Sequence, residues 1–509
     1  MLGSSAGLVL LRESPSSFFS KATERIRQVN CLPSFLVNWS GSQQRNWKKL
    51  NSIELLEATG EWRKSAEAVS KSKSLPRLSE LRGAFRNVER SRLANRRIAR
   101  KPGRTPERPL PKMEIRPLFF LNNSLPHTQS GYTLRTHATL VALQRIGIEV
   151  TGMTRLAYPL VVGKLPGGSS EVVDGVEYRR ILPFFYPEDL ESRFNFTVAA
   201  IVEEAKRAKK TVLHTTTDFY NAQIVAEAAV QLGVPWVYEC RGELHKTWLS
   251  KLPAEFQSRG LESERYRTSE RQELNAMLAA DSVVAISSVS KQRMVEMGVP
   301  PEKISIIPNA VADDLIDRPY EQSRIRAQLQ LPEGYLIGTA SSLVEYEGLD
   351  DLIRAIALTD DLVGVIVGEG VARPLLEKLA ADLGVTDRVI FAGRVPSSEV
   401  WRWYAAMDLF VIPRKDYEVC RSVTPVKGLM AQALGKPIVA SDLPAIREIT
   451  GGLAVYTEPE NSRALLAGIV KAREVFDATR KQSSMNWARE HTWQANATLY
   501  RDLYSKIGG

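Results

Sequence analysis

The sequence predicts an α/β protein with two Rossmann-like domains that follow a basic, mostly helical N-terminal extension. Strand-like apolar runs alternate with helical segments over most of the chain, positive charge gathers before residue 113, and a Pro-rich segment separates these two parts. A chain of 509 residues is too long for one core, and its 44% apolar and 25% charged residues are near globular averages. We therefore expect two or more folded domains.

The basic character belongs to the N-terminal extension, residues 1–112. This segment holds about 23 Lys and Arg against about 9 Glu and no Asp, so the rest of the chain carries a net charge of roughly −4. Its last part, KPGRTPERPLPK at residues 101–112, has the composition of a linker and predicts a domain boundary near residue 113. Cations spaced among apolar residues predict a solvated helical face formed by Arg82, Arg86, Arg90, Arg96, Arg97, Arg100 and Lys101.

Two interpretations of this extension stay open. The first is a soluble helical extension, and the second is peripheral contact of residues 60–112 with an anionic membrane surface. Because the remaining chain is slightly acidic, we expect no nucleic-acid partner.

Cysteine usage and hydropathy favour a cytoplasmic protein. Cys31, Cys240 and Cys420 lie far apart, which predicts neither a disulfide framework nor a metal cluster. The first residues, MLGSSAGLVLLRES, have no basic residue before their short apolar run, and no segment approaches the roughly 18 apolar residues of a spanning helix. We expect a soluble protein or one bound peripherally to the cytoplasmic face of a membrane.

The alternation of strands and helices begins after the linker. A strand-like IRPLFFLNN leads through a turn at Gly131 into a helical segment and then into the strand IEVTGMTR, which makes a βαβ unit. The pattern recurs from TVLHTTT to PWVYECRG and from ADSVVAISS to KISIIPNA. Repeated alternation predicts a parallel sheet with helices on both faces, and we assign residues 113–320 to this first domain.

A second series of strands and helices runs from GYLIGTASSLV to KPIVASD. We assign residues 321–490 to this second domain, because the strand pattern is lost near residues 312–334. The last helix, in residues 491–509, could pack back on the first domain.

Several segments together identify a known family. They are SGYTLRTHATLVALQRIGIEV, VPWVYECRG, ISIIPNAV, ASSLVEYEGLDDLI, VIVGEG, RVIFAGRVP, DLFVIPR and VTPVKGLMAQALGKPIVASD. Their order and spacing resemble glycosyltransferase family 4, a retaining GT-B family, over roughly residues 113–505.

The resemblance implies two Rossmann-like domains facing a cleft. It implies that the second domain binds a nucleoside diphosphate sugar and that a glycan, lipid-linked or small-molecule acceptor is held mainly by the first. The implied reaction moves a sugar to an acceptor hydroxyl with retention, as in polysaccharide or glycoconjugate synthesis. Neither a metal nor another cofactor is implied.

The donor site is predicted between residues 414 and 427. Thr424 can be the N-cap and Pro425 the first residue of a helix that follows DLFVIPR. Free N–H groups at such a helix start attract anions, and three cations lie nearby in the sequence. We predict that a sugar diphosphate binds here, with Lys427 and Arg414 as the catalytic cations and with Arg421, Thr424, Pro425 and Gly368 as donor-binding residues.

The same region departs from the family pattern. The resemblance puts Ser422 and Met430 at two positions, eight apart, where many members have glutamates. It also puts Ser342 and Glu347 where members usually have the Arg and Lys that neutralise the leaving diphosphate. We keep Ser342 and Met430 as donor-binding positions, since a branch of the family has SLV-YEG and TPLK segments like these.

In the first domain, polar residues follow the predicted strands at the edge where α/β sheets bind ligands. His214 ends one strand and is a candidate catalytic residue, although alignment to the family's H-x-H text favours Thr216. A structural role for this histidine, a plain turn at Gly131 and a structural ion pair between Glu239 and Arg241 stay open. The candidate acceptor or cleft residues are Gly131, Arg135, Glu239 and Arg241.

Two other functions are considered. The departures from the family pattern would fit a catalytically inactive GT-B subunit that binds a partner glycosyltransferase or a membrane through its basic N-terminal region. Epimerases and phosphorylases also share the GT-B architecture, but the family segments quoted above are not theirs.

Overall fold

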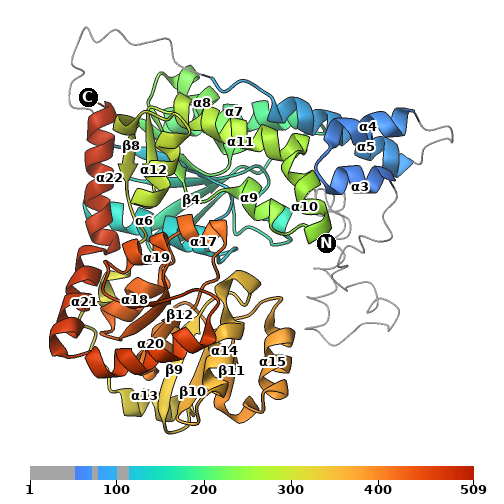
Figure 1. Cartoon of the computed structure of the whole chain (residues 1–509). Helices are drawn as coiled ribbons and strands as arrows, with labels where there is room; N and C mark the ends of the chain where they lie inside the picture. Colours follow the sequence, from blue (N-terminus) through green and yellow to red (C-terminus); the bar gives the residue numbers. More distant parts are fainter. Residues whose placement is uncertain (1–51, 72–77, 100–113, 509) are drawn as a thin grey trace, which may run out of the picture. The chain divides into compact units, whose positions relative to one another are not determined.

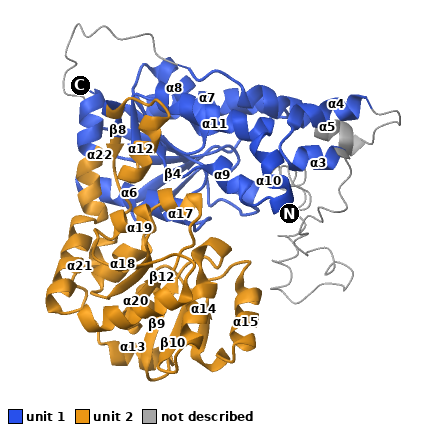
Figure 2. Cartoon of the chain, viewed as in Figure 1, with its two compact units in different colours: residues 1–284, 302–304, 501–509 blue, residues 285–301, 305–500 orange. Residues whose placement is uncertain are grey.

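The computed structural model describes residues 52–71, 78–99 and 114–508 (Figure 1). Cys31, the first 14 residues, the predicted linker, Arg100 and Lys101 lie outside this part of the chain. Contacts group the chain into two compact units (Figure 2). Unit 1 is residues 1–284, 302–304 and 501–509, and unit 2 is residues 285–301 and 305–500. Among the described helices, none is long and apolar enough to cross a membrane.

Unit 1 is built on a twisted eight-stranded sheet with the order β3-β4-β2-β1-β5-β6-β7-β8. The pairs β4–β2, β2–β1, β1–β5 and β5–β6 are parallel, and β3 is antiparallel to β4. The chain passes between the units within β7, between residues 301 and 302, within β8 and within α22. The strands are β1 (Pro117–Leu121), β2 (Thr151–Thr154), β3 (Ser170–Val173), β4 (Val176–Arg180), β5 (Val212–Thr216), β6 (Trp236–Cys240), β7 (Ser282–Ala285) and β8 (Ile304–Ile306).

Helices surround this sheet, and the helix that follows β1, α6, starts with a capping box. Ser130 accepts a hydrogen bond from the backbone of Thr133, and the Thr133 side chain accepts one from the backbone of Ser130, so α6 begins at Gly131. The helices are α3 (Ser52–Ala58), α4 (Trp62–Ser70), α5 (Leu78–Ala94), α6 (Gly131–Arg145), α7 (Leu190–Arg207), α8 (Phe219–Leu232), α9 (Leu244–Leu249), α10 (Ala254–Leu261), α11 (Glu264–Ala279) and the end of α22 (Trp493–Gly508).

The described part of the N-terminal extension packs on unit 1 instead of standing apart from it. Trp62 of α4 and Ala94 of α5 form a small core with Phe219 of α8. The side-chain amides of Gln223 and Gln272 donate to backbone carbonyls at the end of α5 and just after it. These contacts bury the end of α5.

The predicted cationic helix face is therefore wrong at its C-terminal end. α5 ends at Ala94, and the chain beyond it is not helical. The carbonyls of Ala94 and Arg96 accept from Gln272 instead of continuing the helix ladder, and the Arg96 guanidinium lies 4.0 Å above the Phe194 ring. Arg96 and Arg97 thus follow the helix and do not extend its face.

Unit 2 contains a six-stranded parallel sheet with the order β11-β10-β9-β12-β13-β14. Its strands are β9 (Tyr335–Ala340), β10 (Leu362–Val367), β11 (Val389–Gly393), β12 (Leu409–Ile412), β13 (Ile438–Ser441) and β14 (Val455–Thr457). Its helices are α12 (Ser288–Glu296), α13 (Gln322–Gln328), α14 (Leu349–Ala357), α15 (Arg373–Asp382), α16 (Val400–Ala406), α17 (Glu418–Ser422), α18 (Lys427–Ala433), α19 (Pro444–Ile449), α20 (Ser462–Val475), α21 (Ala478–Glu490) and the first half of α22.

Successive residues of the central strands face opposite sides of this sheet. On β9, Leu336 packs in one hydrophobic cluster and Ile337 in the other, and Phe410 and Val411 of β12 divide in the same way. α14, α15 and α20 cover one face, whereas α16, α18 and α19 cover the other. The prediction of two parallel-rich α/β sheets with helices on both faces is confirmed.

Candidate functional site

Two loops at the carboxyl ends of β9 and β12 are joined backbone to backbone. The loop after β9 contains the short 3₁₀ helix η6 (Glu345–Glu347), which ends at Gly348 with φ of +68°. A Cβ at Gly348 would lie 1.8 Å from the carbonyl oxygen of Pro413, so only glycine permits this approach. Lys415 donates its backbone N–H to the Tyr346 carbonyl at 3.0 Å. The loops therefore act as one support for the side chains between them.

A buried ion-pair triad lies at this junction. One Glu347 oxygen, Oε1, lies 2.9 Å from Nη2 of Arg414, and the other contacts the ammonium of Lys427 closely. Glu347, Lys427 and Arg414 are only 5%, 7% and 9% exposed. The structure thus brings together the two cations predicted to bind the diphosphate, but it places a carboxylate between them.

The triad has one positive charge in excess. Burial by itself raises the pKa of Glu347, but Lys427 and Arg414 outweigh it and lower that pKa to about 2. Burial lowers the pKa of Lys427, Arg414 lowers it further, and Glu347 opposes both effects. Two cations thus share one carboxylate in a poorly hydrated place, which favours the approach of another anion.

Polar groups beside the triad lack hydrogen-bond partners among the described residues. They are Nε of Arg414 and the buried hydroxyls of Thr339 and Ser341, at the end of β9 and just after it. Buried polar groups usually have partners, so their concentration at one strand end is typical of a ligand site. The triad and these groups lie at the edge where open α/β sheets bind ligands.

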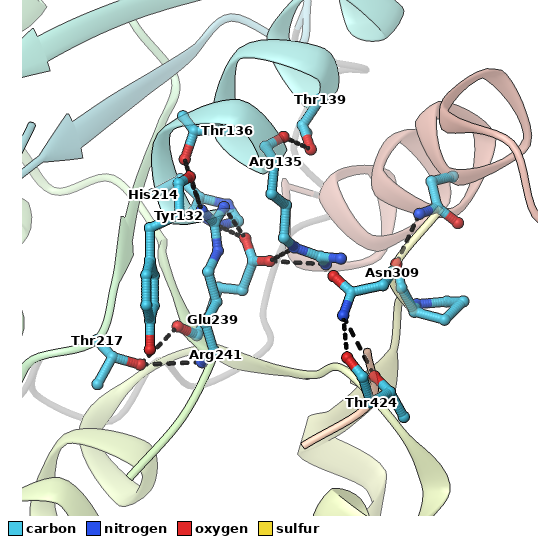
Figure 3. A network of polar contacts seen from close by, with 12 residues as sticks. Tyr132, Arg135, Thr136, Thr139, His214, Thr217, Glu239, Arg241, Asn309 and Thr424 are labelled. Atoms are coloured by element: carbon cyan, nitrogen blue, oxygen red, sulfur yellow. Dashed lines mark hydrogen bonds and ion pairs between the residues drawn. The ribbon is translucent and has the colours of Figure 1, made fainter. Parts of the chain in front are cut away.

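The predicted helix start at Thr424 and Pro425 is wrong. α18 begins at Lys427, its N-cap is Val426, and no side chain caps it. Thr424 is buried, and its carbonyl and hydroxyl oxygens accept from the Asn309 amide at 2.8 and 3.3 Å (Figure 3). Asn309 thus holds Thr424 in non-helical backbone, and Pro425 lies between that anchor and the helix.

Arg421 does not join the triad. It belongs to the separate short helix α17, and its Nε and Nη2 each donate to an oxygen of Asp416 at 2.5 Å. Its side chain is 52% exposed. The charge of Arg421 is therefore matched by a neighbouring carboxylate in solvent.

The other predicted donor-binding positions have diverse surroundings. Ser342 is exposed in the loop after β9, whereas Met430 is half-buried against two hydrophobic clusters. Gly368 follows β10 with φ of +134°, and a Cβ there would lie 1.8 Å from the Ser341 carbonyl oxygen. Met430 provides no polar group for a ribose, and Gly368 allows two loops to touch.

In unit 1, a second buried carboxylate binds two arginines (Figure 3). Glu239, at the end of β6, has Oε1 2.9 Å from Nε of Arg135 and Oε2 2.9 Å from Nη2 of Arg241. Arg241 also donates to the Tyr132 carbonyl at 3.0 Å and to the Thr136 hydroxyl at 2.6 Å. The predicted cleft residues Arg135, Glu239 and Arg241 thus form one network.

The charges of this network also favour an ionised carboxylate. Burial raises the pKa of Glu239, but Arg241 and Arg135 outweigh it and hold that pKa well below its usual range. Nε of Arg241 is buried without a hydrogen-bond partner among the described residues. As in unit 2, the two cations exceed the single anion by one charge.

His214 is fully buried beneath this network. Its Nε2 lies 3.2 Å from Oε2 of Glu239, its Nδ1 lies 2.9 Å from the Tyr504 hydroxyl, and its ring stacks 4.3 Å from Phe119. Burial lowers the pKa of His214. With both nitrogens engaged and no exposed surface, the ring has the surroundings of a structural residue.

Gly131 is exposed at the start of α6, and a Cβ there would meet nothing within 4 Å. Its φ is not positive, so the backbone itself does not require glycine at this position. Thr216, the alternative to His214, is buried at the end of β5, where its carbonyl accepts from the Asn221 amide at 3.2 Å.

Sequence reasoning missed three contacts. It counted Glu347 as an unfavourable charge without pairing it to Lys427, 80 residues later. It also missed Asn309 as the anchor of Thr424 and Tyr504 as the partner of His214. Among the described residues, no group of three or more His, Cys, Asp or Glu side chains could hold a metal ion, and Cys240 and Cys420 are free thiols.

Comparisons with known proteins identify the class. The family model described as "Glycosyl transferase 4-like domain" matches residues 130–310, and "Glycosyl transferases group 1" matches residues 334–474. A sucrose-phosphate synthase from Thermosynechococcus elongatus superposes with a TM-score of 0.60 at 18% identity, over 77% of this chain and 99% of that one. Anabaena Alr3699/HepE in complex with UDP gives 0.58 at 19% identity, over 77% and 100%. The chain has the GT-B fold of glycosyltransferases.

Curated relatives agree with this class. A D-inositol 3-phosphate glycosyltransferase of Thermobispora bispora is 26% identical over 247 residues, 45% of this chain and 56% of the relative. A 2-deoxystreptamine glucosyltransferase of Streptomyces kanamyceticus is 28% identical over 31% of this chain and 41% of the relative. The chain thus spans about half the length of the curated relatives it matches. It belongs to glycosyltransferase family 4.

Proposed function

We propose that this protein transfers a glycosyl group from a nucleoside diphosphate sugar to an acceptor hydroxyl with retention at the anomeric carbon. The observation that carries the proposal is the buried triad of Glu347, Arg414 and Lys427, whose excess positive charge lies at the carboxyl ends of β9 and β12. In an oxocarbenium-like transition state, negative charge develops on the departing diphosphate, and fixed cations stabilise it there. The two cations are therefore proposed as the contacts of the leaving group.

The proposal assigns the proton of the acceptor hydroxyl to the leaving phosphate. A separate general base is then not needed, which is consistent with the burial of His214. We propose no metal and no other cofactor, because Arg414 and Lys427 would neutralise the charge of the leaving diphosphate, which a divalent cation neutralises in other enzymes.

The relatives suggest which ligands to test first. Alr3699/HepE structures contain UDP, or UDP and glucose, or UDP-glucose. The names of the curated relatives refer to an inositol phosphate and to 2-deoxystreptamine, which are small polyhydroxylated compounds. We therefore propose a UDP-sugar as the first donor to test and a polyhydroxylated acceptor, either small or part of a glycan or a lipid-linked sugar.

A location at the cytoplasmic side of a membrane is also part of the proposal. On α5, Phe85 and Val88 are 62% and 52% exposed, and Arg86 and Arg92 are exposed on the same helix. Apolar side chains flanked by arginines suit an anionic membrane surface. Binding to vesicles with anionic lipid, compared with neutral vesicles and with a Phe85→Ser variant, tests this part.

A second candidate function is a catalytically inactive subunit. Met430, at a position where the family often has a glutamate, is packed against core clusters, and Glu347 offsets one of the two buried cations. Thermal unfolding with UDP, ADP, GDP and their sugars separates the two functions, because a ligand that binds the folded state raises the unfolding temperature. Stabilisation followed by sugar transfer, detected by mass spectrometry, supports the enzyme; no stabilisation by any nucleotide supports the inactive subunit.

A further inference from the structure

We propose that Glu347 is a positioning residue for Lys427: it keeps the Lys427 ammonium charged and directed at the phosphate groups of the donor. This inference rests on the proposed function and adds a residue that would act through Lys427 without touching the sugar. It concerns the close contact between the Lys427 ammonium and Oε2 of Glu347.

The support of Glu347 is rigid, so its carboxylate cannot readily withdraw from Lys427. Gly348 brings η6 into backbone contact with Pro413. Two side-chain contacts join the same loops: the Tyr417 hydroxyl donates to Glu345 at 3.0 Å, and the Lys415 ammonium lies 2.8 Å from Asp350. The carboxylate is therefore held between Arg414 and Lys427 before any ligand arrives.

The groups that act electrostatically on Lys427 come from three elements: Glu347 from η6, Arg414 from the segment after β12 and Cys420 from α17. Burial raises the pKa of the Cys420 thiol to about 11, so it is neutral at physiological pH. Arg414 repels the ammonium. Glu347 is thus the carboxylate, among these groups, that stabilises the charged form of Lys427.

Without Glu347, two buried cations would face each other. Removing one partner of a buried ion pair leaves an uncompensated charge, and a lysine answers by losing its proton more easily. Arg414 stays charged because its guanidinium does not deprotonate in proteins. Without Glu347, donor binding should therefore weaken at alkaline pH, because Lys427 loses its proton there.

The test measures binding of UDP, ADP and GDP by isothermal titration calorimetry between pH 7 and 9.5, in wild type and in Glu347→Gln. The variant is expected to lose affinity at least tenfold as pH rises, with a midpoint about one pH unit or more below that of wild type. The matched control is Glu345→Gln, which changes an exposed carboxylate of the same 3₁₀ helix and should follow wild type at every pH. Glu347→Asp keeps the charge and should keep the wild-type midpoint.

The outcomes separate this inference from the proposed function. If wild type binds no nucleotide, the proposed function is contradicted. If wild type binds a nucleotide and Glu347→Gln has an affinity that is lowered equally at every pH or is unchanged, only the role of Glu347 is overturned. If Glu347→Gln does not fold, Glu347→Asp and the double variant Glu347→Gln/Lys427→Met are compared instead. The inference would then be contradicted if nucleotide affinity in Glu347→Asp fell at a lower pH than in wild type. It would also be contradicted if the double variant lost more nucleotide affinity at alkaline pH than wild type does.

Discussion

Glu347 and Lys427 lie 80 residues apart in the sequence and form a buried ion pair at the carboxyl edge of the unit 2 sheet. Glu347 comes from η6 and Lys427 from the start of α18, and Arg414 from the loop after β12 completes the triad. This relationship makes the predicted donor cations interdependent. Removing Lys427 leaves Glu347 with Arg414 as its remaining partner, whereas removing Glu347 leaves two buried cations without a carboxylate.

Lys427→Met is expected to destabilise unit 2 by about 3 kcal/mol, because it leaves Glu347 buried with one partner fewer. The double variant Glu347→Gln/Lys427→Met leaves Arg414 buried without a carboxylate, so its loss should be smaller than the sum of the losses in Lys427→Met and Glu347→Gln but should not vanish. Urea unfolding of wild type, of Lys427→Met, of Glu347→Gln and of the double variant gives the free energies of unfolding. Additive losses in the two single variants and the double would show that the pair is not coupled.

Gly348→Ala is expected to destabilise the protein by more than 3 kcal/mol, because the new Cβ would lie 1.8 Å from the Pro413 carbonyl oxygen. Gly384→Ala is a matched control: its φ of +69° nearly equals the +68° of Gly348, and a Cβ there would meet nothing within 4 Å. The control should cost about 1 kcal/mol, from backbone strain alone. Equal unfolding temperatures for the two variants would contradict the close loop contact.

The buried carboxyl group of Glu273 in α11 should make the stability of the protein depend on pH. It is fully buried, accepts from the Phe219 backbone N–H at 3.0 Å and contacts the Tyr238 hydroxyl closely. Burial, with a contribution from Asp218, raises its pKa from 4.5 to about 8. The folded state therefore keeps a proton that the unfolded state loses, and this stabilisation is complete below about pH 4.5 and is lost as pH rises toward about 8.

Glu273→Gln keeps the shape of this side chain without its titration. Between pH 5 and pH 8.5, wild type should lose more free energy of unfolding than the variant does, as measured by chemical unfolding at each pH. Parallel pH profiles for the two proteins would mean that Glu273 does not keep its proton in the folded state.

Tyr504→Phe removes the hydroxyl that contacts Nδ1 of His214 and should cost about 1 kcal/mol of unfolding free energy. Because both residues belong to unit 1 and His214 is buried, turnover should stay within about twofold of wild type once a substrate is known. Ser505→Ala, in the next and exposed position, is the control for stability. A large loss of turnover with unchanged stability would instead favour a catalytic role for His214.

The fold was predictable because its signals are local. Apolar periodicity predicts the alternation of β9, β10 and β12 with helices. Two of the family segments contain Gly348 and Gly370, where loops meet backbone to backbone. Arg414 and Lys427, which are near each other in the sequence, were predicted to lie at one site, and both contact Glu347 in the structure.

What failed depended on contacts between distant segments. Thr424 has the sequence context of an N-cap, but Asn309, more than 100 residues earlier, holds it in another conformation. Glu347 was counted as an unfavourable charge, but Lys427, 80 residues later, pairs with it. Such pairings are set by tertiary packing, which residue types and spacing do not encode locally.

The central claim is that the triad binds the phosphates of the donor. The most direct test is calorimetry of wild type and of Glu347→Gln/Lys427→Met with UDP and with uridine, which lacks the phosphates. The same comparison is then made for ADP with adenosine and for GDP with guanosine. We expect the double variant to bind the diphosphate at least tenfold more weakly than wild type does and to bind the nucleoside equally well. Equal diphosphate affinity in the two proteins would contradict the claim.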